Sequence, residues 1–207
     1  SFCTALGVNS IAAGYSATAY NSYSTAIGFS ATVTGDYSLA IGQLASASGD
    51  KSTSIGSYTS ASGLGSTAMG VNSKASAPYN VAIGHNLINY GVGSMVIGRY
   101  NRPVLTSPAT GIFSSSPLFI IGNGDSEALR SNALLMTANG KMGIGTDVPE
   151  ADLHISHIAG GGLILENAND NNKWRIYSAS GDNNLTFYNN ADAEVADIDD
   201  VTGAFNA

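Results

Sequence analysis

The amino-acid sequence predicts an all-β protein whose first half is a parallel β-roll, a solenoid of short coils, that assembles as a homotrimer. Three observations predict this fold: a gap-free repeat whose units begin at Ser24, Ser38 and Ser52, small side chains and glycines at fixed places in each unit, and one apolar column that faces away from the coil interior. A connector follows the roll, and after it comes a small β module that we also expect to be trimeric.

The repeat unit consists of two equal halves, as in STAIGFSATVTGDY (24–37) and SLAIGQLASASGDK (38–51). Glycine occupies the same position in nearly every half, at Gly7, Gly14, Gly28, Gly35, Gly42, Gly49, Gly56, Gly63, Gly70, Gly84, Gly91 and Gly98. This spacing indicates corners, where the backbone needs a positive φ or closely approaches its neighbour. A disordered linker has no reason to keep such a register, so the Gly- and Ser-rich composition does not indicate disorder here.

A small side chain, most often alanine, stands two residues before each glycine. Side chains of this size fit the interior of a very narrow coil. Because neighbouring residues in a strand point to opposite faces, the residue directly before the glycine faces outward. In one half of each unit this outward column is apolar, with Ile27, Ile41, Ile55, Met69, Ile83 and Ile97. In the other half it is mostly Ser or Thr.

The outward apolar column predicts self-association. An exposed apolar stripe along a thin rod is an aggregation hazard unless another surface covers it. An interior of alanines also buries too little apolar area to stabilise the coil alone. A closed ring of three chains is the simplest assembly in which equal stripes meet on one axis. We therefore expect these six residues to form the trimer interface.

The units STAIG (24–28), SLAIG (38–42), VAIG (81–84) and MVIG (95–98) resemble the head repeats of YadA-type trimeric autotransporter adhesins. The resemblance covers residues 4–101 and implies a left-handed parallel β-roll trimer. It also implies an extracellular fibre at a cell surface, with a role in adhesion rather than catalysis.

The repeat is no longer visible after Arg99, and Pro103, Pro108 and Pro117 indicate a connecting segment. The blocks that follow predict short strands joined by tight turns: FIIGNG (119–124), SNALLMTANGKMGIGT (131–146) and VPEADLHIS (148–156). They resemble the connector that joins head repeats to later modules in bacterial surface fibres and phage tail fibres. We therefore expect a β-roll over residues 1–101, a connector over 102–156 and a β module over 157–207.

The last part predicts a compact β module. Four segments have the pattern of short strands, LILEN (163–167), KWRIYSAS (173–180), NLTFYN (184–189) and AEVADID (193–199). The module resembles β modules near the ends of phage tail fibres and of the mosaic adhesive trimers of predatory bacteria.

Aromatic and amide side chains occur together in this module, and we select five of them as the candidate ligand site: Trp174, Tyr177, Tyr188, Asn183 and Asn184. Aromatic faces and amides hold sugars by stacking and hydrogen bonding. The alternative is that the aromatic residues form the core that a small domain needs. Both interpretations stay open at this point.

Charge and motifs exclude several classes of function. The net charge is −7, and residues 1–101 hold three cationic and two anionic side chains, so the acidity lies in residues 102–207. Without a basic stripe we expect no nucleic-acid partner, and without a run of about 18 apolar residues we expect no membrane insertion in this part. Nucleotide, zinc-protease and serine-hydrolase motifs are absent. We expect no catalysis, cofactor or metal; a hydrolytic set of Asp147, Glu150 and Asp152 is the alternative.

The sequence thus predicts a segment of a trimeric fibrous adhesin. We expect its ligand to be a surface glycan, or a matrix or cell-surface protein, of a host or prey. The alternative is a phage-type tail fibre that binds, or hydrolyses, host polysaccharide.

Overall fold

The computed structural model describes residues 2–104, 114–157, 160–167, 172–179, 185–188, 194–198 and 205–206. These residues form strands, turns and bends, and no helix occurs among them that is long and apolar enough to cross a membrane. The chain divides into two compact units, Ser1–Leu153 and His154–Ala207.

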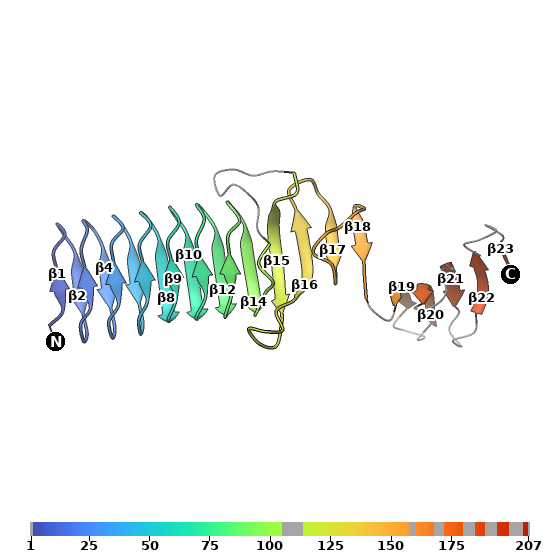
Figure 1. Cartoon of the computed structure of the whole chain (residues 1–207), viewed down its shortest axis with the longest axis horizontal. Helices are drawn as coiled ribbons and strands as arrows, with labels where there is room; N and C mark the ends of the chain where they lie inside the picture. Colours follow the sequence, from blue (N-terminus) through green and yellow to red (C-terminus); the bar gives the residue numbers. More distant parts are fainter. Residues whose placement is uncertain are drawn as a thin grey trace. The chain divides into compact units, whose positions relative to one another are not determined.

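The first unit is a β-solenoid whose strands alternate along the chain between two sheets (Figure 1). The short sheet contains β1 (Thr4–Ala5), β3 (Thr18–Ala19), β5 (Thr32–Val33), β7 (Ser46–Ala47), β9 (Ser60–Ala61), β11 (Lys74–Ala75) and β13 (Ile88–Asn89). The long sheet contains β2 (Ile11–Ala13), β4 (Thr25–Ile27), β6 (Leu39–Ile41), β8 (Thr53–Ser57), β10 (Thr67–Val71), β12 (Val81–His85), β14 (Met95–Arg99), β15 (Pro117–Asn123), β16 (Asn132–Thr137), β17 (Met142–Ile144) and β18 (Leu153–Ile155). The predicted all-β solenoid is confirmed.

The sequence period sets the register between coils. Successive coils pair in parallel, so that Ala26 lies opposite Ala40 and Ile27 lies opposite Ile41. Each residue therefore lies beside its equivalent in the next repeat unit. Side chains at equivalent positions of the repeat therefore stack in columns. The left-handed sense of the coil stays a prediction.

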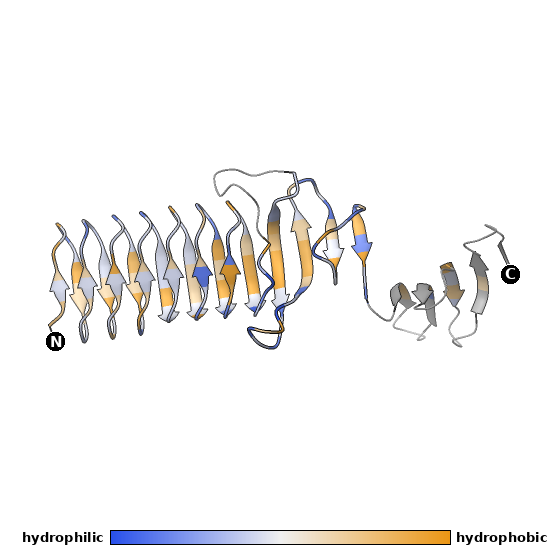
Figure 2. Cartoon of the chain, in the orientation of Figure 1, coloured by the Kyte–Doolittle hydropathy of each residue, from blue (hydrophilic) through white to orange (hydrophobic). Residues whose placement is uncertain are grey.

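The alanine column fills the interior, as predicted. Ala26, Ala40, Ala68 and Ala82 are fully buried. The neighbouring apolar column faces outward, with Ile27 and Ile83 each 38% exposed and the other members half-buried. Figure 2 shows the bands of apolar residues along the coils.

Glycine is required at the corners because the coils stack backbone against backbone. A Cβ on Gly56, whose φ is +128°, would lie 1.9 Å from the carbonyl oxygen of Gly70. In the other half of the unit Gly35 has no positive φ, but a Cβ there would lie 2.2 Å from the carbonyl oxygen of Gly49. Close approach therefore explains both sets of glycines, whereas a positive φ applies to one set.

The left-handed backbone occurs at a second corner position that the sequence analysis missed. Two residues after a corner position, which is glycine except at Asn21 and Ala77, a residue other than glycine often has φ between 41° and 59°: Asn9, Ser16, Tyr23, Ser30, Tyr37, Leu44, Lys51, Tyr58, Asn72, Tyr79, Asn86 and Tyr100. This region is costly for L-residues. Contacts between coils hold it, as where the Tyr37 N–H donates to the Ser22 carbonyl oxygen at 3.0 Å.

The long sheet continues beyond the last coil of the roll. Strand β15 pairs in parallel with β14, with Val96 opposite Ile120, Ile97 opposite Ile121 and Gly98 opposite Gly122. The FIIG segment (119–122) is therefore a further copy of the MVIG unit (95–98). Strands β16 and β17 then add in antiparallel fashion. The visible period ends at Arg99, but the sheet does not.

The second unit contains an antiparallel sheet in the order β19-β20-β21-β22-β23. Its strands are β19 (Gly160–Asn167), β20 (Asn172–Ala179), β21 (Leu185–Tyr188), β22 (Glu194–Ile198) and β23 (Phe205–Asn206). The four strands predicted in this part correspond to β19–β22.

Candidate functional site

The outer face of the long sheet presents apolar side chains in nearly every strand from β4 to β17. Within the roll it has two columns. The first is the predicted interface column, in which Ile41 lies opposite Ile55 and Ile83 lies opposite Ile97. The second lies two residues earlier in each strand and includes threonines. We call the apolar members the head face: Ile27, Leu39, Ile41, Ile55, Met69, Val81, Ile83, Met95 and Ile97.

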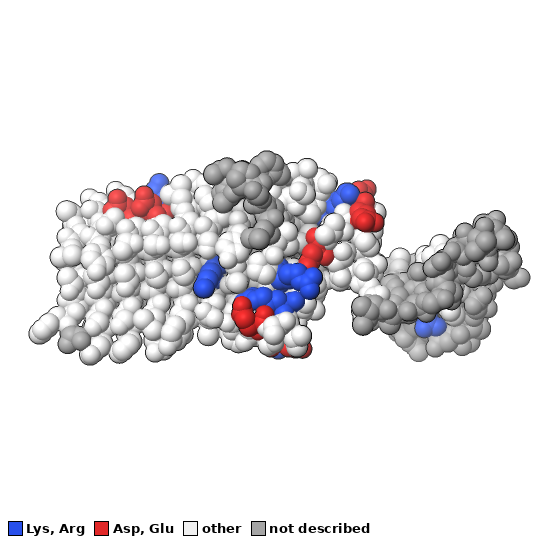
Figure 3. Space-filling model, viewed as in Figure 1, with Lys and Arg blue, Asp and Glu red and all other residues white. Residues whose placement is uncertain are grey.

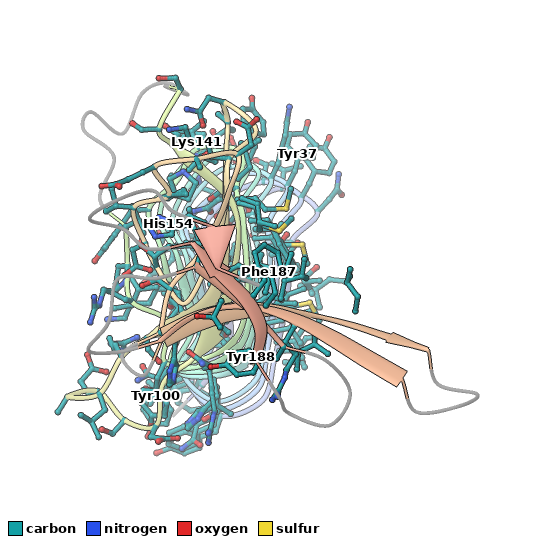
Figure 4. The ribbon with its side chains drawn as sticks, turned by 90° about the vertical axis from the view of Figure 1, so that its right-hand side faces the viewer. Tyr37, Tyr100, Lys141, His154, Phe187 and Tyr188 are labelled. Carbon is teal, nitrogen blue, oxygen red and sulfur yellow. The ribbon has the colours of Figure 1, made fainter. Side chains whose placement is uncertain are left out.

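Both columns continue into the strands after the roll. Ile121 lies opposite Leu134, which in turn lies opposite Ile144. We call the continuation the connector face, and it consists of Phe119, Ile121, Leu134, Met136, Met142 and Ile144. In the end-on view of Figure 4 the sulfur atoms, drawn in yellow, gather on one side of the ribbon, as expected for methionines that share one face.

The two outward columns from which these faces are taken contain threonine besides the apolar residues, but no charged side chain. On the side shown in Figure 3 one group of charges lies over the first coils, and a larger group lies near the end of the roll. The group near the end of the roll forms ion pairs, with Arg99 to Asp125 at 2.7 Å and Arg102 to Asp147 at 3.3 Å. The outward columns of the short sheet are mostly Ser and Thr, so only one side of the solenoid is a continuous apolar surface.

Two asparagine amides close the end of the roll. After β13, the last strand of the short sheet, Asn101 Oδ1 accepts from the Ile88 N–H at 2.8 Å and Asn101 Nδ2 donates to the Ile88 carbonyl oxygen at 2.9 Å. Asn132 does the same for Arg102, at 3.0 and 2.8 Å. The Asn101 side chain thus replaces the peptide group of a next strand beside Ile88. Unpaired strand edges invite aggregation, and the Asn101 amide covers one residue of this edge.

A pocket of about 340 Å³ lies beside Arg102, Asn132 and Asp147. The polar groups there are already paired with one another, because Asn132 Nδ2 donates to Asp147 Oδ1 at 2.7 Å and the Arg102 guanidinium bonds Asp147 Oδ2. These contacts tie the segments around residues 102, 132 and 147 together. They give Asp147 a structural role, which weakens the alternative of a hydrolytic set.

Arg130 holds the last corners of the roll. Its side chain is largely buried, and its Nη1 donates to the carbonyl oxygens of Asn86 at 2.7 Å and Asn101 at 3.0 Å. Its Nη2 bonds Glu127 Oε2 at 2.5 Å. This hydrogen bond holds the pKa of the exposed Glu127 carboxyl below its usual value of 4.5, with a smaller coulombic contribution from Arg130.

Exposed aromatic side chains occur on the roll itself, a feature that the sequence analysis assigned to the C-terminal part. Tyr15 stacks on Phe29 with ring centroids 5.0 Å apart, and Tyr23 stacks on Tyr37 at 4.9 Å. Stacking covers one face of each ring, and the four side chains remain about half exposed to solvent. The spacing of these aromatics by one repeat unit was the signal that could have revealed the pairs.

The predicted ligand residues of the second unit are only partly described. Trp174 and Tyr177 occupy β20, opposite Leu165 and Gly162 of β19, and their backbone positions, three apart, belong to opposite faces of the sheet. Tyr188 in β21 lies opposite Arg175, whose guanidinium carbon is 5.1 Å from the ring centroid. Asn183 and Asn184 lie outside the described residues. The ligand site stays a prediction.

Within the described ranges, no three His, Cys, Asp or Glu side chains gather in a way that could hold a metal ion. A comparison with curated proteins gives no match. The family model described as "YadA head domain repeat (2 copies)" matches residues 5–31, 34–59 and 61–86. These segments are the stacked coils, with the buried small side chains and the outward column. The YadA head is an adhesin-type domain. Residues 5–86 of this chain are therefore similar to YadA head repeats.

Proposed function

We propose that the chain is a segment of a homotrimeric adhesive fibre at a cell surface, which binds a surface ligand without catalysing a reaction. The head face carries this proposal. It is an uncharged apolar stripe that runs along the coils, and in a single chain it is left partly exposed to water. A stripe of this kind needs a partner surface.

Three copies of the same chain supply that partner surface. YadA-type heads form trimers. A closed threefold ring brings three equal stripes onto one axis and leaves no unmatched copy, whereas an open arrangement would generate filaments. The interface column then consists of Ile27, Ile41, Ile55, Met69, Ile83 and Ile97, each against its own copies. Their burial would give about 25 cal/mol for each Å² removed from water.

In this assembly the roll over residues 1–101 serves as a rigid shaft or head, the connector over 102–156 joins it to the next part, and the β module over 157–207 presents the ligand surface. The ligand is a surface glycan, or a matrix or cell-surface protein. Trp174, Tyr177, Tyr188, Asn183 and Asn184 supply the aromatic and amide groups that such ligands need. Three linked copies raise weak single contacts to useful avidity.

The test is binding of the intact chain to an array of glycans and matrix proteins, with a reducing-sugar assay on every glycan that is retained. We expect retention without released sugar, loss of retention in the Trp174→Ala, Tyr177→Ala double variant, and no loss in the matched Tyr58→Ala, Tyr79→Ala variant of the roll. Released sugar contradicts binding without catalysis. Equal loss in both variants moves the ligand site away from the β module.

A further inference from the structure

The connector face is more uniformly apolar than the head face. In the roll, the second outward column includes Thr25, Thr53 and Thr67, so several coils present only one large apolar side chain. In β15, β16 and β17 both columns are large and apolar, with Phe119, Met136 and Met142 in one and Ile121, Leu134 and Ile144 in the other. The apolar character of the sheet thus increases where the family match has already ended.

The core of the solenoid does not explain these side chains. The same strands turn Ile120 and Leu135 inward, and these two side chains are 2% and 1% exposed. The inner face of the strands is therefore already packed. The six residues of the connector face point the other way, where Ile144 remains 40% exposed and the other five are half-buried.

The register shows that the two faces form one surface. The pairs Met95 with Phe119 and Ile97 with Ile121 keep the same alignment as the pairs between coils of the roll. A slip of one residue would turn every apolar side chain of β15 to the opposite face. The chain keeps this alignment although the connection between β14 and β15 is longer than the connections within the roll.

We propose that the trimer interface of the roll continues through β15, β16 and β17, so that the connector face of each subunit packs against the connector faces of two other copies of this chain. This inference rests on the proposed trimer. The connector face is continuous with the head face, so we assign both to the same occupant, another copy of this chain. A different partner on the connector face would have to begin at β15, directly beside the self-association of β14. The nearby charges favour the same occupant, since Arg99 and Arg102 are already paired with carboxylates of their own chain.

Site-specific cross-linking tests the proposal. Cys3 is the only cysteine, so a Cys3→Ser background accepts single cysteines at Ile55 in the head face, at Ile121 in the connector face, and at Ser60 on the short sheet as a control. A short bismaleimide joins two thiols that lie near a common axis and leaves the third free. We expect covalent dimers from Ile55→Cys and Ile121→Cys, and none from Ser60→Cys.

The outcomes separate the two proposals. Cross-linking at position 55 without cross-linking at position 121 overturns the extended interface and leaves the trimer intact. Cross-linking at neither position, in a chain that sediments as a monomer, overturns the trimer itself. A second measurement uses Ile144→Asp, with Leu129→Asp as control because Leu129 is 66% exposed and lies off the face. We expect only Ile144→Asp to raise the trimer dissociation concentration, by at least tenfold, and an unchanged value contradicts the inference.

Discussion

Ile97 and Ile121 lie directly opposite each other in the parallel strands β14 and β15, although more of the sequence separates them than separates paired residues within the roll. Pairs within the roll are one repeat unit apart in the sequence, as for Ile83 and Ile97. The register is the same across the longer connection between β14 and β15, so the outward apolar column and the inward column both continue. The long sheet is therefore the continuous element of the first unit.

The Ile41→Asp, Ile55→Asp double variant should abolish trimers. The two residues are paired neighbours on the head face, and a trimer would place six carboxylates around one axis, away from water. Sedimentation velocity should show a single-chain species. The matched control is Ser46→Asp, Ser60→Asp, which introduces the same charges at paired positions of the short sheet and should stay trimeric. Trimers in the first variant, or their loss in the control, would contradict the assignment of the interface.

Asn101→Ala should lower the free energy of unfolding by about 1–3 kcal/mol, because the part-buried N–H and carbonyl of Ile88 each lose a hydrogen bond to the fully buried Asn101 side chain. Asn101→Asp should be no better, since a carboxylate accepts from the N–H but cannot donate to the carbonyl. Asn123→Ala, at an exposed position, serves as control. Thermal unfolding at fixed protein concentration measures all three. If Asn101→Ala unfolds like the control, the amide does not close the short sheet.

Gly56→Ala should prevent correct stacking of the coils, while Gly140→Ala should be tolerated. Both glycines have a positive φ, +128° and +85°, but only at Gly56 would the added Cβ meet backbone, at 1.9 Å from the Gly70 carbonyl oxygen. No atom lies within 4 Å of a Cβ on Gly140, so its cost is conformational, about 1–2 kcal/mol. Circular dichroism and thermal unfolding separate the two. Similar effects would mean that φ, rather than close approach, selects the corner glycines.

Arg130→Ala should destabilise the protein more than Glu127→Gln does. The first change removes a donor from the carbonyl oxygens of Asn86 and Asn101, whereas the second removes one exposed ion pair, which contributes little. Because the pKa of Glu127 is lowered in the folded protein, the contribution of the pair is present above pH 4.5 and disappears as the pH falls below that value. Unfolding midpoints from pH 7 to pH 3 should show this acid-dependent part in the wild type and not in Glu127→Gln.

Much of the roll could be predicted from the sequence because coil stacking repeats one environment in every unit. Ala26 and Ala40 had to face inward and Ile27 and Ile41 outward once strand alternation was applied, and burial confirms both. The corner residues such as Tyr23 and Tyr37 were missed, because glycine was taken as the marker of positive φ. In the structure the second residue after the corner position, Gly35 for Tyr37 but Asn21 for Tyr23, adopts the left-handed backbone, and hydrogen bonds to the adjacent coil hold it there.

The continuation into β15 was missed for a different reason. A search at fixed spacing fails when a connection lengthens, even though FIIG (119–122) has the same pattern as MVIG (95–98). The roles of Asn101 and Asn132 were also out of reach, because an amide that replaces a peptide group depends on which strand is last in the sheet. The ligand site in the second unit stays a prediction, since sequence distance alone does not bring Trp174 and Asn183 onto one surface.

Sedimentation equilibrium of the intact wild-type chain tests the central claim most directly. If head faces pack around a threefold axis, the mass should be three times that of one chain and should stay constant over a wide concentration range. A mass equal to one or two chains would contradict the proposed fibre architecture.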